Sequence, residues 1–273
     1  MAHALENIDR RWIFLIMGLL VLLPLLFPLA LPLVVSNRVQ GFHDTIAKVP
    51  DGSTVLMPCD YDPGAIPELV PMTRTALRQL FQKNCKVVVL CLWNGGPGLV
   101  DNVVRSVATE MNKQDGVDFV NLGFKEGREA VMVVMGQGIA NAFPRDYRGQ
   151  ETRSLPVMRG VRDYSSFPLL VSISAGYPGT KEWVQQVQAR FHIPVVAGVT
   201  AVSAPEYYPY LQSGQLLGLL GGMAGAAEYE KARGEKGTAT RGMDAQSMAH
   251  IFVALCILAG NWVQWSKSRS VVP

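Results

Sequence analysis

The sequence is poor in charge and in clustered basic residues, and this shortage bears on its partners. Charged residues make up 17% of the 273 residues, and the formal net charge is only +3. A nucleic-acid-binding surface typically gathers lysine and arginine into a basic patch or stripe. In this sequence the basic residues are scattered along the chain instead. The sequence therefore predicts no nucleic-acid partner.

Histidine and cysteine are also too few and too scattered to form a recognisable ligand set. The four histidines are His3, His43, His192 and His250, and the four cysteines are Cys59, Cys85, Cys91 and Cys256. The cysteines show neither the short paired spacing of a zinc site nor the density of a disulfide framework. The sequence predicts no metal site and identifies no cofactor.

What the chain has in excess is apolar side chains, which make up 49% of its residues. Residues 12–35 carry no charge and are long enough to cross about 30 Å of hydrocarbon. Pro24, Pro28 and Pro32 remove backbone donors from the second half, which we expect to be kinked or partly unwound. The run is longer than the apolar core of a signal peptide. We predict a transmembrane helix over 12–35.

A second apolar run, residues 247–265, lies near the C-terminus. It is shorter and carries polar residues, but Trp262 and Trp265 bound it as interfacial anchors do. We predict a second transmembrane helix here, with short tails at 1–11 and 266–273.

The basic residues that flank the two runs bear on orientation in the cell (inner) membrane. Arg10 and Arg11 before the first run, with Lys267 and Arg269 after the second, favour cytoplasmic tails and an extracytoplasmic central domain. Basic residues on the domain side, such as Arg38, favour the opposite orientation. We predict cytoplasmic tails, and the orientation stays open.

Residues 53–230 alternate short β-branched runs with longer amphipathic stretches, the pattern of βαβ units. Several runs are continuously apolar, as expected of strands that helices cover on both faces. We predict an α/β fold with a three-layer, mostly parallel sheet, Rossmann-like or flavodoxin-like, joined to the spans by linkers at 36–52 and 231–246. The predicted strands are Thr54–Met57, Lys86–Trp93, Val117–Leu122, Ala130–Met135, Phe167–Ser172 and Ile193–Val199.

Two helices and one long excursion connect these strands. Thr180–Phe191 and the stretch that follows Gly98 carry apolar residues at helical spacing, and we attribute these to the core. The polar stretch Phe143–Ser166 has five arginines and no periodicity. Such a segment is either an ordered lid or contact surface, or a disordered loop.

Ligands of open α/β sheets bind at the carboxyl ends of the strands. The turn NGGPG at 94–98 offers backbone donors to an anion at a helix N-terminus. It is neither a Walker motif nor GxGxxG, and a tight strand-to-helix connection also needs glycine. The predicted ligand-binding residues are Asp60, Asp62, Asn94, Gly95, Gly96, Ser174 and Thr200.

Two residue pairs near the first strands have alternative interpretations. Asp60 and Asp62 suit acid–base work or cation binding, but Asp-x-Asp-Pro-Gly is also ordinary turn chemistry. Cys59 and Cys91 fall at equivalent positions on two strands and would be close if those strands pair in that register. A buried thiol most often serves as a small apolar side chain.

The segment VVVLCLWNGGPGLVDNVV, residues 87–104, resembles the oxyanion turn of Clp-protease-like and crotonase-like proteins, including membrane-anchored signal-peptide peptidases. The resemblance implies a serine nucleophile activated by histidine or lysine, and Ser174 and Lys181 are the available pair. It does not extend to a nucleophilic serine at the head of a later helix. Their positions in a turn and in the first turns of a helix predict solvent exposure for both residues.

Glycines recur every fourth residue before the second span. On one helix Gly214, Gly218 and Gly222, with Gly225 in a second row, would form a smooth strip that another backbone can approach. The strip could pack on the domain's own sheet, on a neighbouring copy or in the membrane. We predict that these glycines mediate oligomerisation.

These observations favour a membrane-anchored α/β domain that acts as a self-assembling structural or interaction protein without catalysis. Its predicted partners are the lipid bilayer, further copies of itself and other membrane proteins. The alternatives are a sensory domain that binds a small ligand or nucleotide, and a membrane-bound serine hydrolase.

Overall fold

A computed structural model describes residues 9–29 and 31–270, with side chains described as far as residue 266. The chain divides into an anchor unit, residues 1–33 with 236–273, and a domain, residues 34–235. The predicted tails 1–11 and 266–273 lie largely outside the described residues.

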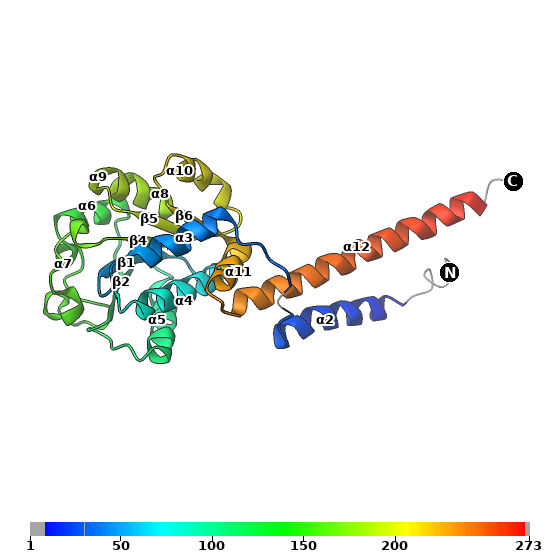
Figure 1. Cartoon of the computed structure of the whole chain (residues 1–273), viewed down its shortest axis with the longest axis horizontal. Helices are drawn as coiled ribbons and strands as arrows, with labels where there is room; N and C mark the ends of the chain where they lie inside the picture. The colour runs from blue at the N-terminus through cyan, green and yellow to red at the C-terminus, as the bar shows by residue number, and fades with distance from the viewer. Residues whose placement is uncertain (1–8, 30, 271–273) are drawn as a thin grey trace. The chain divides into compact units, whose positions relative to one another are not determined.

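The domain is built on a six-stranded sheet in which every pairing is parallel (Figure 1). The strand order β3-β2-β1-β4-β5-β6 is that of Rossmann-type sheets, so the predicted parallel α/β fold is confirmed. The strands are β1 (Thr54–Asp60), β2 (Lys86–Cys91), β3 (Phe119–Phe124), β4 (Leu170–Ser174), β5 (Val195–Val199) and β6 (Gly218–Gly221).

Helices cover both faces of the sheet, which is why its strands read as continuous apolar runs. One face packs against α3 (Asn37–Lys48), α4 (Ile66–Gln82), α5 (Pro97–Glu110) and α11 (Gly222–Ala232). The other carries α6 (Glu129–Gln137), α7 (Ile139–Ala142), α8 (Thr180–Trp183) with the π-helical turn η5 (Val184–Gln188) and α9 (Ala189–Phe191), and α10 (Tyr208–Gln212).

The β1–β2 register agrees with the one considered from the sequence, because Val55 pairs with Val87. In this register Cys59 and Cys91 lie at neighbouring positions of β1 and β2, on the same face of the sheet. Both thiols are free and fully buried. Burial raises the pKa of each thiol well above its usual value, so both are protonated at neutral pH. They act here as small apolar core residues.

The predicted strand Ala130–Met135 is wrong, because this segment lies in helix α6. Arg128 precedes the helix with a φ of 51°, a turn that redirects the chain after Gly127. Val133 and Val134 remain 45% and 38% exposed, which a central strand does not allow. A six-residue apolar run is too short for periodicity to separate helix from strand.

The predicted glycine-rich helix is also wrong. Gly214 lies in a turn with a φ of 75°, Gly218 is in strand β6, and Gly222 and Gly225 belong to helix α11. A Cβ on Gly218 would overlap the backbone of Phe42, so glycine is what lets α3 lie directly on β6. The spacing of four residues therefore reflects several unrelated packing needs within the domain.

The predicted linker 36–52 contains helix α3, which belongs to the domain. Its Phe42 ring packs edge-on against Tyr229 of α11, with the centroids 4.9 Å apart. Ser36, before the first turn, donates to Glu228 from both its backbone N and its Oγ, at 2.8 and 2.6 Å. Helices α3 and α11, the first and last of the domain, are therefore packed and hydrogen-bonded together.

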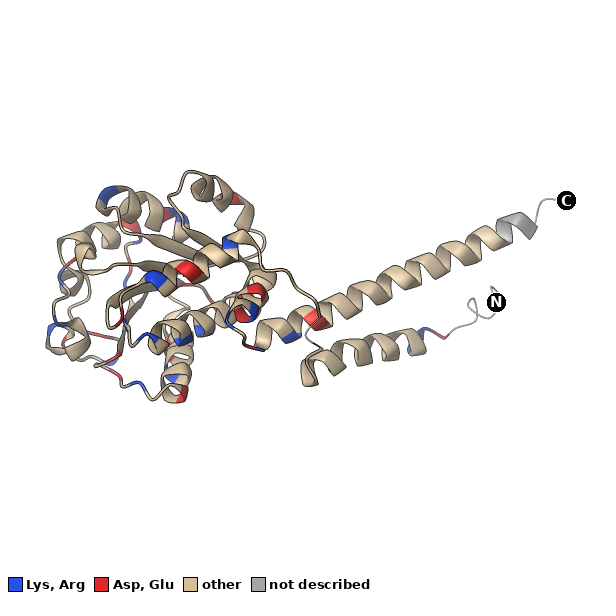
Figure 2. Ribbon diagram, in the orientation of Figure 1, with Lys and Arg blue, Asp and Glu red and all other residues tan. Residues whose placement is uncertain are grey.

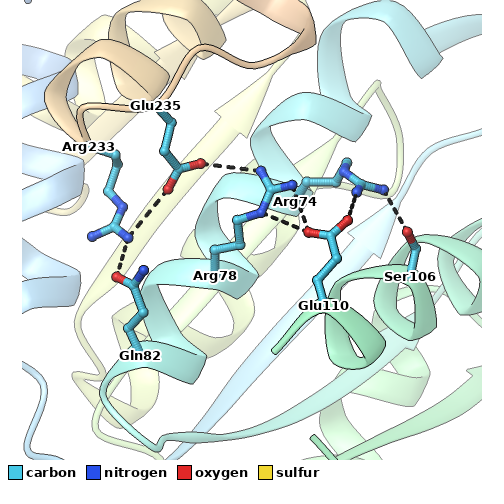
Figure 3. A network of polar contacts seen from close by, with 7 residues as sticks. All are labelled: Arg74, Arg78, Gln82, Ser106, Glu110, Arg233 and Glu235. Atoms are coloured by element: carbon cyan, nitrogen blue, oxygen red, sulfur yellow. Dashed lines mark hydrogen bonds and ion pairs between the residues drawn. The ribbon is translucent and has the colours of Figure 1, made fainter. Parts of the chain in front are cut away.

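The predicted linker 231–246 is shorter than expected, because α11 runs to Ala232 and α12 (Thr238–Ser270) begins soon after. Between them a network of charges fastens the end of the domain (Figure 3). Arg78 of α4 contacts Glu110 of α5 at 2.8 Å and Glu235 at 3.2 Å. Arg233 contacts Glu235 at 3.4 Å, and Arg74 joins through Glu110. The last residue of the domain is therefore bound to two helices of one layer.

The polar stretch Phe143–Ser166 is ordered and forms three short 3-10 helices: η2 (Thr152–Ser154), η3 (Pro156–Met158) and η4 (Tyr164–Ser166). Leu155, Val157 and Tyr164 point into the core, and the Tyr164 hydroxyl donates to the Met132 carbonyl at 2.9 Å. These buried anchors hold an otherwise polar segment against the sheet.

The anchor unit consists of α2 (Arg10–Leu26) and α12, which pack against each other. Among the described helices, the segment Thr238–Ser266 of α12 is long and apolar enough to cross a membrane, and it contains the predicted second span. Helix α2 is shorter and ends at Leu26, before Pro28 and Pro32. Among the described residues that follow, the chain is non-helical to residue 35, as the prolines predict. Figure 2 shows the long stretch of α12 without charge.

Replacing Gly218 by alanine should lower the free energy of unfolding of the domain by about 2–3 kcal/mol, because the added Cβ forces α3 off β6. Chemical denaturation of the full chain in detergent measures this. Gly95→Ala is the matched control and should cost less than about 1 kcal/mol, since its Cβ would meet only Asp62 Cβ at 3.5 Å. Unchanged stability together with a smaller oligomer would instead favour the glycine strip predicted from the sequence.

Glu110→Gln should lower the free energy of unfolding by about 1 kcal/mol at neutral pH, the range of exposed ion pairs. Partial burial raises the pKa of Glu110, but Arg78 and Arg74 lower it more, so its net pKa lies below the usual value. A lowered pKa stabilises the folded state above the ordinary carboxylate range, and this gain disappears as the pH falls through the folded pKa. The difference between wild type and variant should therefore shrink on acidification. Glu126→Gln, an exposed carboxylate outside the network, should show no such trend.

Candidate functional site

The switch point of the sheet lies between β1 and β4, where strand order reverses and Asp60 pairs in register with Ser174. The Asp60 side chain is completely buried. Its carboxylate accepts hydrogen bonds from the Leu92 backbone N at 2.6 Å and from the Trp183 Nε1 at 2.8 Å. These bonds join β1 to the end of β2 and to α8, and they engage both oxygens of the carboxylate.

Burial raises the pKa of Asp60 to about 7, against the opposing effect of the hydrogen bonds from Trp183 and Leu92. The negative charge of nearby Glu182 makes a smaller contribution to this raised pKa. The group therefore changes charge near neutral pH in the folded protein.

Ser174 is 1% exposed and belongs to a small hydroxyl network. Its Oγ accepts from the Thr180 backbone N at 3.0 Å and lies 2.9 Å from the Thr180 Oγ1, which in turn lies 2.8 Å from the Ser172 Oγ. Lys181 is exposed, and its side chain makes no hydrogen bond to Ser174. The expected exposure is wrong for Ser174, and no serine–lysine dyad forms at this turn.

The loops after β2 and β4 meet above the end of β1 and close the switch point. The Trp93 Nε1 donates to the Pro178 carbonyl at 2.7 Å. Beneath it, the Ala175 N donates to the Asp60 carbonyl at 3.0 Å. The Trp93 indole thus bridges the two loops that flank the position where this topology commonly binds ligands.

The remaining predicted ligand residues are dispersed along this edge. Asp62 caps its own turn, accepting from the Gly64 N at 2.9 Å, and Thr200 lies 3.0 Å from the Ser203 hydroxyl. Gly95 is exposed, whereas Gly96 is buried with no room for a Cβ beside the Tyr61 carbonyl. These residues build turns, and each turn uses its polar groups internally.

An open cavity of about 570 Å³ lies next to the closed switch point, at the carboxyl ends of β2 and β3. Asn94 is the one predicted ligand residue that lines it. The first turn of α5 forms one wall, the end of β3 forms the floor, and the start of the polar excursion forms the opposite wall. The lining residues are Asn94, Pro97, Gly98, Leu122, Gly123, Phe124, Lys125, Ala142, Phe143, Pro144, Arg145, Asp146 and Tyr147.

The electrostatics of this cavity favour an anion. The first turn of a helix leaves backbone N–H groups without intrahelical acceptors and carries the positive end of the helix dipole. Lys125 and Arg145 add two cations, and within the described chain neither contacts a carboxylate. Asp146 is the one acidic lining residue, and its Oδ1 already accepts from the backbone of Arg148 and Gln150 at 2.9 and 2.7 Å.

A buried asparagine ties the floor of the cavity to its wall. Asn121 of β3 donates from Nδ2 to the Pro97 carbonyl and to the Asp101 Oδ1, both at 3.4 Å. Its Oδ1 accepts from the Gly123 N at 2.9 Å, and its carbonyl accepts from the Tyr147 N at 2.9 Å. Asn121 thus positions α5 and the end of β3 through its side chain, and the excursion through its backbone carbonyl.

Most residues that line the cavity were not predicted from the sequence. Lys125 follows the third strand directly, and strand-end position alone is the signal that could have identified it. Arg145 and Tyr147 open the polar excursion, but nothing in the sequence indicates that this segment folds back over the NGGPG turn. Of the NGGPG turn, Asn94, Pro97 and Gly98 line the cavity.

Comparison with protein families, with curated proteins and with solved structures gives no match. The chemistry of the cavity is therefore the basis for assigning a function.

Asp60→Asn tests the buried carboxylate through the pH dependence of stability. The folded pKa of about 7 lies above the unfolded value of 3.8, so the native state keeps a proton that the unfolded chain releases between these values. Stability contributed by Asp60 is therefore fully present below pH 3.8 and falls as the pH rises toward 7, by at most about 1.4 kcal/mol per pH unit. The stability contributed by asparagine at this position does not depend on pH. Its NH2 group would also face one of the two N–H donors that the Asp60 oxygens accept from.

The variant should consequently be less stable than the wild type near pH 5, with a gap that narrows toward pH 8. Urea unfolding at a series of pH values measures the gap. A gap that stays constant or widens would show that Asp60 is ionised throughout this range.

Proposed function

We propose that this chain is a membrane-anchored ligand-binding domain that takes a small anion, such as a phosphate-bearing metabolite or nucleotide, in the cavity at the carboxyl ends of β2 and β3. The supporting observation is the convergence of the α5 N-terminus with Lys125 and Arg145 on one open cavity. Helix N-termini and the side chains of lysine and arginine all bind phosphate in proteins.

The volume and lining suit a small organic anion. A cavity of about 570 Å³ lies within the range of roughly 300–1,000 Å³ that small-molecule pockets occupy. Leu122 and Phe143 provide apolar contact, and the half-exposed Tyr147 stands beside Gly98. Asn94 can both donate and accept, which suits the polar edge of a ligand.

The anchor completes the proposal. Helix α2 has 17 residues, about 25 Å at 1.5 Å per residue, and exposes large side chains such as Trp12 and Phe14. We propose that α2 and the extended segment after it cross the bilayer beside α12 in the cell (inner) membrane. Two spans place both tails on one side and the domain on the other. The flanking basic residues favour cytoplasmic tails.

Self-association, the function first predicted from the sequence, lacks its expected surface. Gly218, Gly222 and Gly225 are buried within the domain, and Gly214 alone of the four is exposed. A homo-oligomer, or a complex with another membrane protein, would have to use other residues. Ligand binding is the better supported function for this reason.

Full-length protein in detergent should be stabilised against heat by at least one of inorganic phosphate, pyrophosphate and nucleoside diphosphates. The double variant Lys125→Ala, Arg145→Ala should weaken that binding by about tenfold or more, since each hydrogen bond to a charged group contributes about 1.5–3 kcal/mol. Thermal shift and equilibrium dialysis measure the effect.

Arg159→Ala is the matched control, because Arg159 is an exposed arginine of the same excursion outside the cavity lining. It should leave anion binding unchanged. Absence of stabilisation by every anion tested, or equal weakening by the control, would count against the proposed site.

A further inference from the structure

The connection between β5 and β6, residues 200–217, exposes several apolar side chains, alongside the polar residues Gln212 and Ser213. Glu206 is its one charged residue. Val202 is 86% exposed, more than any other large hydrophobic side chain of the domain, and Pro205 and Pro209 are exposed beside it. Leu217, the last residue of the connection, is 45% exposed.

Two tyrosines and one arginine border these exposed residues. The rings of Tyr208 and Tyr210 pack on the core of the domain, and their hydroxyls find no hydrogen-bond partner in the described part of the chain. The guanidinium of Arg38 lies 4.8 Å above the centre of the Tyr208 ring. Arg38 is exposed and has no carboxylate partner among residues 9–29 and 31–266. Polar tips on apolar bodies are typical of the membrane interface.

The chain enters the domain at this same surface. Ser36, Arg38, Ala201, Ala204 and Tyr208 line one small cavity of about 150 Å³. Glu228 fixes Ser36 in place through the two hydrogen bonds described above. The last residue of the anchor unit, Leu33, is three residues away and can lie no more than about 11 Å from Ser36. The first residues of the domain therefore lie beside the β5–β6 connection.

We propose that the β5–β6 connection is a membrane-contact surface whose partner is the phospholipid bilayer that holds the anchor. Val202 enters the boundary between head groups and acyl chains, while the hydroxyls of Tyr208 and Tyr210 and the guanidinium of Arg38 meet lipid phosphates and esters. Glu206 stays on the aqueous side. This inference rests on the proposed insertion of the segment after α2, and it would fix one edge of the sheet against the membrane.

Spin labels on single cysteines test the contact in full-length protein reconstituted in phosphatidylcholine nanodiscs. In a Cys256→Ala background the three remaining native cysteines are buried. Labels are placed by Val202→Cys at the proposed contact, Leu22→Cys in α2 and Val133→Cys on α6, positions that are 86%, 50% and 45% exposed. Collision with oxygen reports lipid, and collision with a polar nickel chelate reports water.

The labels at 202 and 22 should both favour oxygen, and the label at 133 should favour nickel. A nickel-accessible label at 202 with an oxygen-accessible label at 22 would overturn the surface contact while leaving the anchor intact. Nickel access at both positions would overturn the contact and the N-terminal span together. A label at 202 that favours oxygen in nanodiscs and loses this preference in the Arg38→Gln, Tyr208→Ser variant would support the contact and the role of these two side chains.

Discussion

The Asp60 carboxylate accepts one hydrogen bond from the end of β2 and one from the indole of Trp183, and the shape of the carboxyl edge follows from this arrangement. Both of its oxygens are engaged within the protein, and the side chain is completely buried. The Trp93 indole joins the loops that follow β2 and β4. The open cavity lies beside the switch point instead, at the ends of β2 and β3. There the N-terminus of α5 contributes the positive end of its helix dipole.

The parallel sheet was predictable because strands covered on both faces leave a distinctive signal of continuous apolar runs, and five of the six predicted strands overlap real ones. The failure at Ala130–Met135 has a physical cause, since six apolar residues satisfy either period. Strand β6 was missed because two of its four residues are glycine, which is depleted in strands. Here glycine is required by the close approach of α3, a tertiary demand that no local pattern encodes.

Of the predicted ligand residues, Asn94 alone lines the cavity. Sequence position correctly placed Asp60, Asp62, Ser174 and Thr200 at strand ends, but it carries no information on which polar groups are consumed by neighbouring turns. Asp62 and Gly64, or Ser174 and Thr180, satisfy each other locally. Lys125 and Arg145 remain without a carboxylate partner in the described chain, and that availability emerges only once the excursion is folded back on β3.

The packing of α3 on β6 and α11 also has a consequence for how the chain is made. Ser36 and Glu228 are 192 positions apart in sequence, yet they close the same layer. During synthesis α3 leaves the ribosome early, and the strand and helix that it packs against appear only near the end of the domain. Helix α3 therefore cannot pack until β6 and α11 have been synthesised. Closure of this layer is a late step of folding with a large entropic cost. A chain truncated before β6 would expose Phe42 and the apolar face of α3, a form that cellular quality control could recognise as unfinished.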